Sequence, residues 1–182
     1  NGIGFLRAEN VAGMDFLDTS KMNYIDEETH TGFLKRSILC ENDLLITIAG
    51  TLGRTAIVRR DNLPLNANQA ISIVRLVSPI EFDLMYLICA LNSPLIQKML
   101  TEQKKITAIP NLTLEIIADC FIPIPPLSEQ HRIVKKIEEL LPFIEKYAQA
   151  ETQLTALNTS FPEALKKSIL QEAVQGRLVP QD

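Results

Sequence analysis

The sequence predicts an α+β fold, with a mixed β-sheet domain over residues 1–126 and a long, coiled-coil-like helical region over residues 127–182. Two observations predict this division. Short runs of alternating or β-branched apolar residues occupy the first part of the chain, which is typical of strands. Apolar residues recur at helical spacing in the last part. Between them lies FIPIPPLSEQHRIVKKIEELL (residues 121–141), where closely spaced prolines require an extended backbone directly before an amphipathic segment.

Four segments of the first part are predicted strands, because they alternate in polarity or are rich in aliphatic residues. A glycine turn, Gly50–Gly53, separates the second from the third, and NLPLNAN (residues 62–68) reads as a loop because it contains a proline and three asparagines. The predicted strands are residues 3–11, 43–50, 54–60 and 69–77.

Three helices are predicted between the strands and the prolines. Residues 82–94 are apolar on all sides, which favours a buried helix. Residues 93–103 begin with Ser93 as a cap and a proline at the first helical position. Residues 113–120 begin with Thr113 as a cap, and the segment 121–126 must then be extended.

The last part carries a heptad seam, with apolar residues spaced alternately four and three apart. Ser128 is the expected cap at its start, and Gly176 is the expected terminator. Pro142 and Pro162 are expected to kink or break the helix. The seam comprises Ile133, Ile137, Leu140, Ile144 and Tyr147, and continues loosely through Leu154, Leu157, Phe161, Leu165, Ile169 and Ala173.

A continuous helix from Ser128 to Gly176 would be about 70 Å long at 1.5 Å per residue, whereas a domain of this size is only about 30 Å across. Two alternatives follow from this mismatch. Either the helical region folds back into a hairpin, near Pro142, Asn158 or Pro162, or its seam pairs with a partner helix.

Composition limits the function classes. Hydrophobic residues make up 46% and charged residues 22%, which favours a globular protein over a disordered chain. No apolar run is long enough to span a bilayer. The three cysteines, at positions 40, 89 and 120, have no metal-ligand spacing, so we expect buried, reduced thiols in a cytoplasmic protein. The first residue is Asn1 rather than Met, which indicates a fragment or a processed chain.

No motif for phosphate, dinucleotide or metal chemistry is present, so no catalytic residue and no metal site are predicted. Glu27 and Glu28 form a carboxylate pair, but the segment around them reads as a solvated loop.

Charge is unevenly distributed. The net charge is −4, but residues 15–28 hold five acids against one base, and residues 35–75 hold six bases against three acids. Taken alone, this pattern favours solvated surface charge, because charged residues are mostly exposed. A nucleic-acid surface is the alternative.

Several stretches together resemble the specificity subunits of Type I restriction–modification systems. IPIPPLSEQHRIVKKIEELLPFIEKY (residues 122–147), through its prolines, Glu129, Gln130 and Ile133, is similar to the start of the helical region in that family. SILQEAVQGRLVPQD (residues 168–182) is similar to the end of that helical region. AGTLGRTAIV (residues 49–58) and NANQAISIVRL (residues 66–76) resemble segments of the family's target recognition domain.

The resemblance implies that the chain is non-catalytic. In the family, each recognition domain reads half of a bipartite DNA site, and helical regions act as spacer and as docking surface for methyltransferase subunits. S-adenosylmethionine and ATP belong to the methyltransferase and restriction subunits, so this chain is expected to bind no cofactor. The family carries two recognition domains and two helical regions, and this chain has one of each. We therefore expect pairing with a second half-subunit or a second copy. A helical assembly protein that does not bind DNA is the alternative.

Two sets of residues follow as candidates. The expected partner interface is the seam, namely Ile133, Ile137, Leu140, Ile144 and Leu154. The acidic stretch Asp15–Glu28 is expected to face away from double-stranded DNA. The expected DNA contacts are Lys35, Arg36, Arg54, Arg59, Arg60, Lys104 and Lys105, with Asn66, Asn68 and Gln69 as candidate readers of base edges. For Asn68 and Gln69, each taken alone, a role as turn residues is the favoured alternative.

Overall fold

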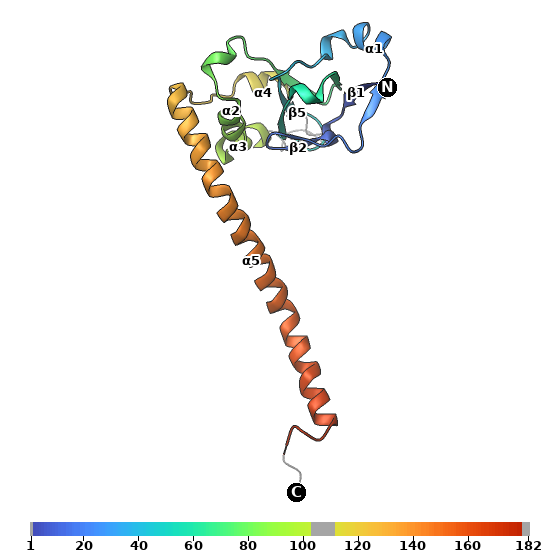
Figure 1. Cartoon of the computed structure of the whole chain (residues 1–182), viewed down its shortest axis with the longest axis vertical. Coiled ribbons are helices and arrows are strands. Elements are labelled where there is room, and N and C mark those ends of the chain that lie inside the picture. The colour runs from blue at the N-terminus through green and yellow to red at the C-terminus, as the bar shows by residue number, and fades with distance from the viewer. Residues whose placement is uncertain (1, 103–111, 180–182) are drawn as a thin grey trace. The chain divides into compact units, whose positions relative to one another are not determined.

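The computed structural model describes residues 2–102 and 112–179, and it has the predicted α+β fold. Small β-sheets and short helices occupy the first part, and a single helix occupies most of the last part (Figure 1). Two compact units are present, Asn1–Val134 and Lys135–Asp182. The elements are β1 Ile3–Leu6, η1 Ala8–Asn10, β2 Val11–Gly13, β3 Phe16–Leu17, β4 Asn23–Ile25, α1 Glu27–Thr31, η2 Lys35–Ser37, β5 Leu44–Thr47, β6 Thr55–Ile57, η3 Arg60–Asn62, β7 Leu65–Ala67, β8 Ile71–Val74, η4 Pro79–Glu81, α2 Leu84–Leu91, α3 Pro94–Glu102, α4 Leu114–Ala118 and α5 Leu127–Val174.

The strands form three small sheets. One is mixed, with the order β4-β1-β7, because β1 pairs antiparallel with β4 and parallel with β7. The second is the pair β2-β3, and the third has the order β6-β5-β8 with antiparallel pairing throughout. The turn between β5 and β6 is the predicted glycine turn, in which Gly50 and Gly53 have φ values of 79° and 77°. Glycine adopts this left-handed region without the steric cost that other residues meet.

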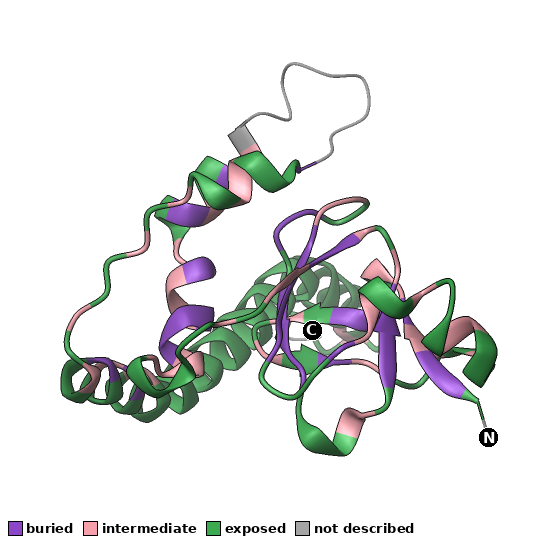
Figure 2. Cartoon of the chain, turned by 90° about the horizontal axis from the view of Figure 1, so that it is seen from above, coloured by how far each residue is buried: buried purple, intermediate pink, exposed green. Residues whose placement is uncertain are grey.

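Strand β5 lies at the centre of the hydrophobic core, and all four of its residues are buried. Successive side chains point to opposite faces of a strand. Leu45 accordingly packs with Leu6 and Val58 on one face, whereas Leu44 packs with Leu87 and Ile88 of α2. Buried residues concentrate on the strands and on α2 and α3, and α5 is exposed over most of its length (Figure 2). Both faces of β5 are covered, so its sequence is continuously apolar rather than alternating.

Three predictions for the first unit are wrong in detail. The segment predicted as a loop, residues 62–68, contains β7, whose pairing with β1 joins residues about sixty positions apart. The first predicted strand ends at Leu6, where η1 follows. Glu27 and Glu28 begin helix α1 instead of lying in a loop, because the Asp26 carboxylate accepts a hydrogen bond from the Thr29 amide and caps the helix.

The predicted helices of the first unit are present. Asp83 caps α2 by accepting hydrogen bonds from the Met85 and Tyr86 amides. Thr113 caps α4, as predicted, through a bond from the Ile116 amide. The residues that bury the apolar face of α2 are Tyr86, Leu87, Ile88 and Leu91.

The proline-rich joint is held by two side chains. The Tyr86 hydroxyl donates to the Pro123 carbonyl at 2.6 Å. Gln130, whose side chain is fully buried, accepts from the Asp83 amide at 2.9 Å and donates to the carbonyls of Pro125 and Glu81 at 2.8 and 3.3 Å. Val134 is buried as well. The first two turns of α5 are therefore part of the first compact unit, which explains why that unit ends at Val134 while the helix begins at Leu127.

Helix α5 is continuous through both prolines, so neither proline breaks it and the hairpin alternative does not hold. An interior proline removes one donor and crowds the carbonyl four residues earlier, at a cost of about 3 kcal/mol, but its fixed φ lies in the α region, and here the helix continues on both sides of each proline. Ser128 is also not the cap: the Glu129 and Gln130 amides bond to the Pro126 carbonyl, and the helix begins one residue before the serine. At 1.5 Å per residue, 48 residues give a helix of about 70 Å.

The C-terminal end of α5 agrees with the prediction. Gly176 has a φ of 68°, the Arg177 amide bonds to the Glu172 carbonyl, and the Gly176 amide bonds to the Ala173 carbonyl. This pair of bonds is the Schellman arrangement, which supplies partners to the last helical carbonyls.

We predict that Gln130→Leu lowers the free energy of unfolding of the first unit by about 2–4 kcal/mol. The change keeps the volume but leaves one buried donor and two buried acceptors without partners, each costing about 1–3 kcal/mol. Chemical denaturation followed by circular dichroism measures the effect. Ser128→Ala is the matched control, because Ser128 is exposed and is not the cap. Equal stability of the two variants would contradict this account of the joint.

Candidate nucleic-acid interface

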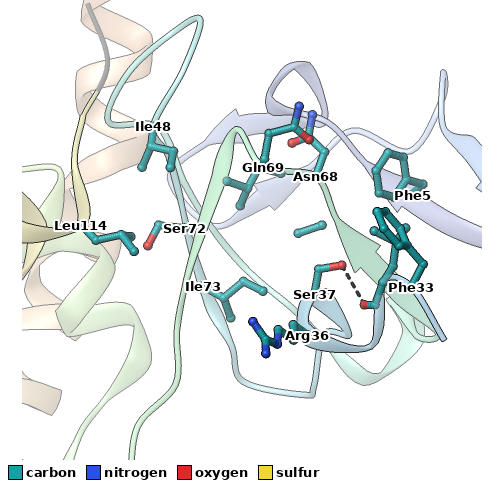
Figure 3. A pocket seen from close by; sticks show the side chains of 13 residues that line it. Phe5, Phe33, Arg36, Ser37, Ile48, Asn68, Gln69, Ser72, Ile73 and Leu114 are labelled. Carbon is teal, nitrogen blue, oxygen red and sulfur yellow. Dashed lines mark hydrogen bonds between the residues drawn. The ribbon is translucent and has the colours of Figure 1, made fainter. Parts of the chain in front are cut away.

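An open groove of about 540 Å³ lies on the first unit, at the ends of β7 and β8 and beside the segment 33–37. Figure 3 shows its lining. Phe5 and Phe33 lie on the opposite side of the view from Ile48 and Leu114, and Asn68 and Gln69 lie between them in the upper part of the view. The floor is apolar, and the polar groups are few. The lining residues are Phe5, Phe33, Leu34, Arg36, Ser37, Ile48, Ala67, Asn68, Gln69, Ile71, Ser72, Ile73 and Leu114.

Asn66 fixes one wall of this groove from inside. Its side chain is fully buried, and its amide nitrogen donates to the Leu34 carbonyl at 2.9 Å and to the Ser37 hydroxyl at 3.1 Å. Its amide oxygen contacts Nδ1 of His30. The Ser37 hydroxyl in turn donates to the Leu34 carbonyl (Figure 3). Asn66 is thus a support for the segment 33–37, and its amide is not presented to a base edge.

The other two amides differ from each other. Asn68 is half-buried, and its Oδ1 accepts a hydrogen bond from the Ala70 amide at 3.1 Å, as in an Asx turn. Gln69 is exposed, and its side chain makes no hydrogen bond within the described part of the chain. A bidentate contact to adenine needs both the oxygen and the nitrogen of an amide. Only Gln69 of this pair has both groups available.

The predicted cations have different surroundings. Lys35, Arg36, Arg54 and Arg60 are exposed, and none of them forms an ion pair with the residues that the structure describes. Arg36 lines the groove. Lys104 and Lys105 lie outside the described residues.

Two arginines of the basic region are paired with acids. Arg59 forms an ion pair with Asp15 at 2.5 Å. The Arg75 guanidinium donates two hydrogen bonds to the buried Asp43 carboxylate, at 2.7 and 2.6 Å. This hydrogen bonding raises the pKa of the Arg75 guanidinium above its ordinary value. These two side chains contribute less positive charge to the surface than the sequence indicates.

The acidic stretch is not separate from the basic region. Asp15 belongs to that stretch and pairs with Arg59. Helix α1 carries Glu27 and Glu28, and the Thr29 carbonyl accepts from the Leu34 amide directly beside Lys35. The prediction that the stretch faces away from DNA and the prediction that Arg59 contacts DNA therefore conflict at Asp15.

Phe33 is the groove residue that the sequence prediction missed. It is 92% exposed, although the segment that carries it is held by hydrogen bonds on both sides. Its sequence signal was an aromatic residue two positions before a Lys-Arg pair, in a segment with no strand or helix periodicity. Single exposed apolar residues are common, so the signal acquires meaning only from the groove.

The helical seam is mostly uncovered. Leu140, Ile144 and Leu154 are exposed, together with Tyr147, Leu157 and Phe161 further along the helix. Ile137 is half-buried, and Ile133 packs against the core beside Val134, within the first unit. The available seam therefore begins after Ile137.

Other site chemistries find no support in the described residues. No three His, Cys, Asp or Glu side chains come together there as metal ligands would. Cys40 is exposed, and Cys89 and Cys120 are half-buried, so the prediction of buried cysteines is wrong for all three. Partial burial raises the pKa of the Cys120 thiol. None of the helices in the described ranges combines the length and apolar character that a bilayer crossing requires.

Comparison with known proteins agrees with the resemblance. Residues 7–156 match the family model described as the Type I restriction modification DNA specificity domain. The chain is 35% identical over 171 residues to the Type I restriction enzyme EcoBI specificity subunit of Escherichia coli, covering 91% of this chain and 33% of the relative. It is 35% identical over 78 residues to the EcoDI specificity subunit of the same organism, covering 41% of this chain and 16% of that relative.

Solved structures share the fold. The HsdS subunit from Thermoanaerobacter tengcongensis superposes with a TM-score of 0.63 at 20% identity, covering 94% of this chain and 43% of that one. A chain from a structure described as the basis of complex assembly and conformational transition of the type I R-M system gives a TM-score of 0.56 at 18% identity, covering 98% and 40%. The present chain thus spans about a third of EcoBI and less than half of either structural neighbour.

We predict that Arg75→Met destabilises the first unit by about 1–3 kcal/mol, because it leaves the buried Asp43 carboxylate without its cation. The loss is smaller than for a fully buried pair, since the Arg75 side chain is 54% exposed. Thermal or chemical denaturation gives the difference. Arg60→Met is the control, as Arg60 is exposed and has no ion pair with a described residue. A loss at Arg60 equal to that at Arg75 would show that the pair with Asp43 is not the cause.

Proposed function

Because the chain belongs to the Type I restriction–modification DNA specificity family, we propose that it reads one half of a bipartite DNA target within a specificity subunit. The observation that carries the proposal is the groove. It combines an apolar floor, an available amide at Gln69 and an unpaired guanidinium at Arg36, next to Lys35. Cations that contact phosphates supply affinity, and groups that reach base edges supply sequence preference.

The acidic net charge does not oppose this proposal. Phosphate contacts depend on local charge, and exposed charges farther away than about 10 Å are largely screened at ordinary salt. Asp43 and Asp15 are already neutralised by Arg75 and Arg59. Lys35, Arg36, Arg54 and Arg60 remain as exposed cations of the first unit that form no ion pair with a described residue.

We assign the exposed seam of α5 to partner binding. A row of exposed apolar side chains on a helix of 48 residues favours a second helix as the occupant, and antiparallel pairing would give two recognition domains pseudo-twofold symmetry. The proposed partners are a second half-subunit or a second copy of this chain, methyltransferase subunits, and the restriction subunit through the complex. S-adenosylmethionine and ATP are then needed only on those partner subunits, and the complex works in the cytoplasm.

The first prediction concerns phosphate contacts. We expect Lys35→Ala with Arg36→Ala to weaken binding to all duplexes and to reduce the slope of log K against log salt by about 2, since each lost phosphate contact removes about 0.9. Fluorescence anisotropy with mixed duplex DNA across a salt series measures this slope. Lys166→Ala with Lys167→Ala removes the same charge from the second unit and should leave the slope unchanged. A wild type that binds no duplex at any salt would favour the helical assembly protein instead.

The second prediction concerns the seam. We expect the wild type to self-associate, and Ile144→Asp with Leu154→Asp to be monomeric, because losing one buried aliphatic contact commonly costs about 2–5 kcal/mol. Sedimentation velocity measures the state, and circular dichroism checks that α5 is retained. Gln149→Asp with Ala156→Asp adds the same charge on the other side of the helix and should leave the dimer intact. Dimers that survive the seam variant would place the contact elsewhere.

A further inference from the structure

We propose that the groove reads an A·T base pair, with Phe33 against the thymine 5-methyl group and the Gln69 amide against the major-groove edge of the paired adenine. The inference rests on the proposed function and deepens it by naming the chemical group that each side chain recognises. Both residues line the same groove, one from the segment 33–37 and one from the turn between β7 and β8.

Phe33 is the residue proposed to recognise the thymine. The 5-methyl group of thymine is the apolar group that the major groove of unmodified DNA presents. Phe33 offers an apolar surface that is 92% exposed and lines a groove whose floor is also apolar. The segment behind it is fixed, because buried Asn66 donates to the Leu34 carbonyl and the Ser37 hydroxyl. The backbone that carries Phe33 therefore need not be ordered on binding, which lowers the cost of binding.

Gln69 is the residue proposed to recognise the adenine. Adenine presents N7 as an acceptor and N6 as a donor, and a glutamine or asparagine amide satisfies both at once. The Gln69 amide makes no hydrogen bond to a described residue, whereas the Asn68 oxygen is occupied by the Ala70 amide. An apolar surface and an available amide in one groove are complementary to the single base pair that carries a methyl group on one base and the N6–N7 pair on the other.

The surrounding charge favours DNA as the occupant over another protein. Arg36 lines the groove, Lys35 precedes it, and neither side chain has an ion-pair partner within the described ranges. These two neighbouring cations would contact phosphates on one side of the base pair.

Selection of duplexes from a random pool, followed by sequencing, first gives the motif that the full chain prefers. Anisotropy titrations then use the selected duplex with single-atom changes, namely each thymine replaced by uracil and each adenine by 7-deazaadenine. We expect one A·T pair at which uracil weakens wild-type binding by about fourfold, the effect of one buried methyl group. At the same pair, 7-deazaadenine should weaken binding by about tenfold, at the lower end of the range for a bidentate contact.

The variants assign each effect to its residue. Phe33→Ala should bind the thymine and uracil duplexes equally, and Gln69→Ala should bind the adenine and 7-deazaadenine duplexes equally. Phe16→Ala removes another exposed aromatic residue of the first unit, outside the groove lining, and should keep both differences. Circular dichroism of each variant checks the fold, which should be unaffected since Phe33 and Gln69 are exposed.

Three results would overturn the inference while leaving the proposed function standing: a selected motif without an A·T pair, no thymine sensitive to loss of its methyl group, or sensitivity that persists in Phe33→Ala and Gln69→Ala. A pool that yields no motif for the folded wild type would overturn the proposed function and this inference with it.

Discussion

The buried amide of Gln130 is the contact on which the organisation of the chain depends. It joins three backbone segments, the cap of α2 at Asp83, the end of η4 at Glu81 and the proline joint at Pro125. A glutamine fits this position because it accepts one bond and donates two while carrying no charge, so its burial avoids the cost of desolvating an ion. Without it, the first turns of α5 would be tied to the recognition domain mainly by Ile133, Val134 and the prolines.

Asn66 is a second buried amide with a supporting role, at the groove. It is also fully buried, and it joins β7 to a segment about thirty residues earlier in the chain. Both amides use donor and acceptor together: Gln130 bonds three backbone groups, and Asn66 bonds the Leu34 carbonyl and the side chains of Ser37 and His30. Support of this kind explains how the short segment 33–37, which contains only the 3-10 turn η2, can present Phe33 and Arg36.

The sequence predicted what depends on local chemistry. Thr113 caps its helix, the glycines at 50 and 53 make the turn, and Gly176 ends α5, because each follows from the conformational preferences of a few neighbouring residues. Strand β7 was missed because its pairing with β1 is a long-range contact within a segment that reads locally as a loop. The break predicted at Pro142 and Pro162 was wrong for the opposite reason. A proline is a local signal that a helix ends, but here the helix continues on both sides of it. Asn66 and Gln69 look equivalent in the sequence, and only the fold separates the buried support from the available amide.

That separation bears on how the specificity of such a domain can change. Phe33 and Gln69 have no structural partner that their replacement would leave unsatisfied, so substitution there has little cost to folding. Asn66 lies behind the groove and bonds the Leu34 carbonyl and the Ser37 hydroxyl, whereas Gln130 bonds three backbone groups at the proline joint, and replacing either residue removes these bonds. If Phe33 and Gln69 meet a base pair as proposed, the groove can exchange these side chains while Asn66 keeps its support of the segment 33–37. A recognition domain built in this way could acquire a new target sequence without altering the joint, held by Gln130, from which α5 begins.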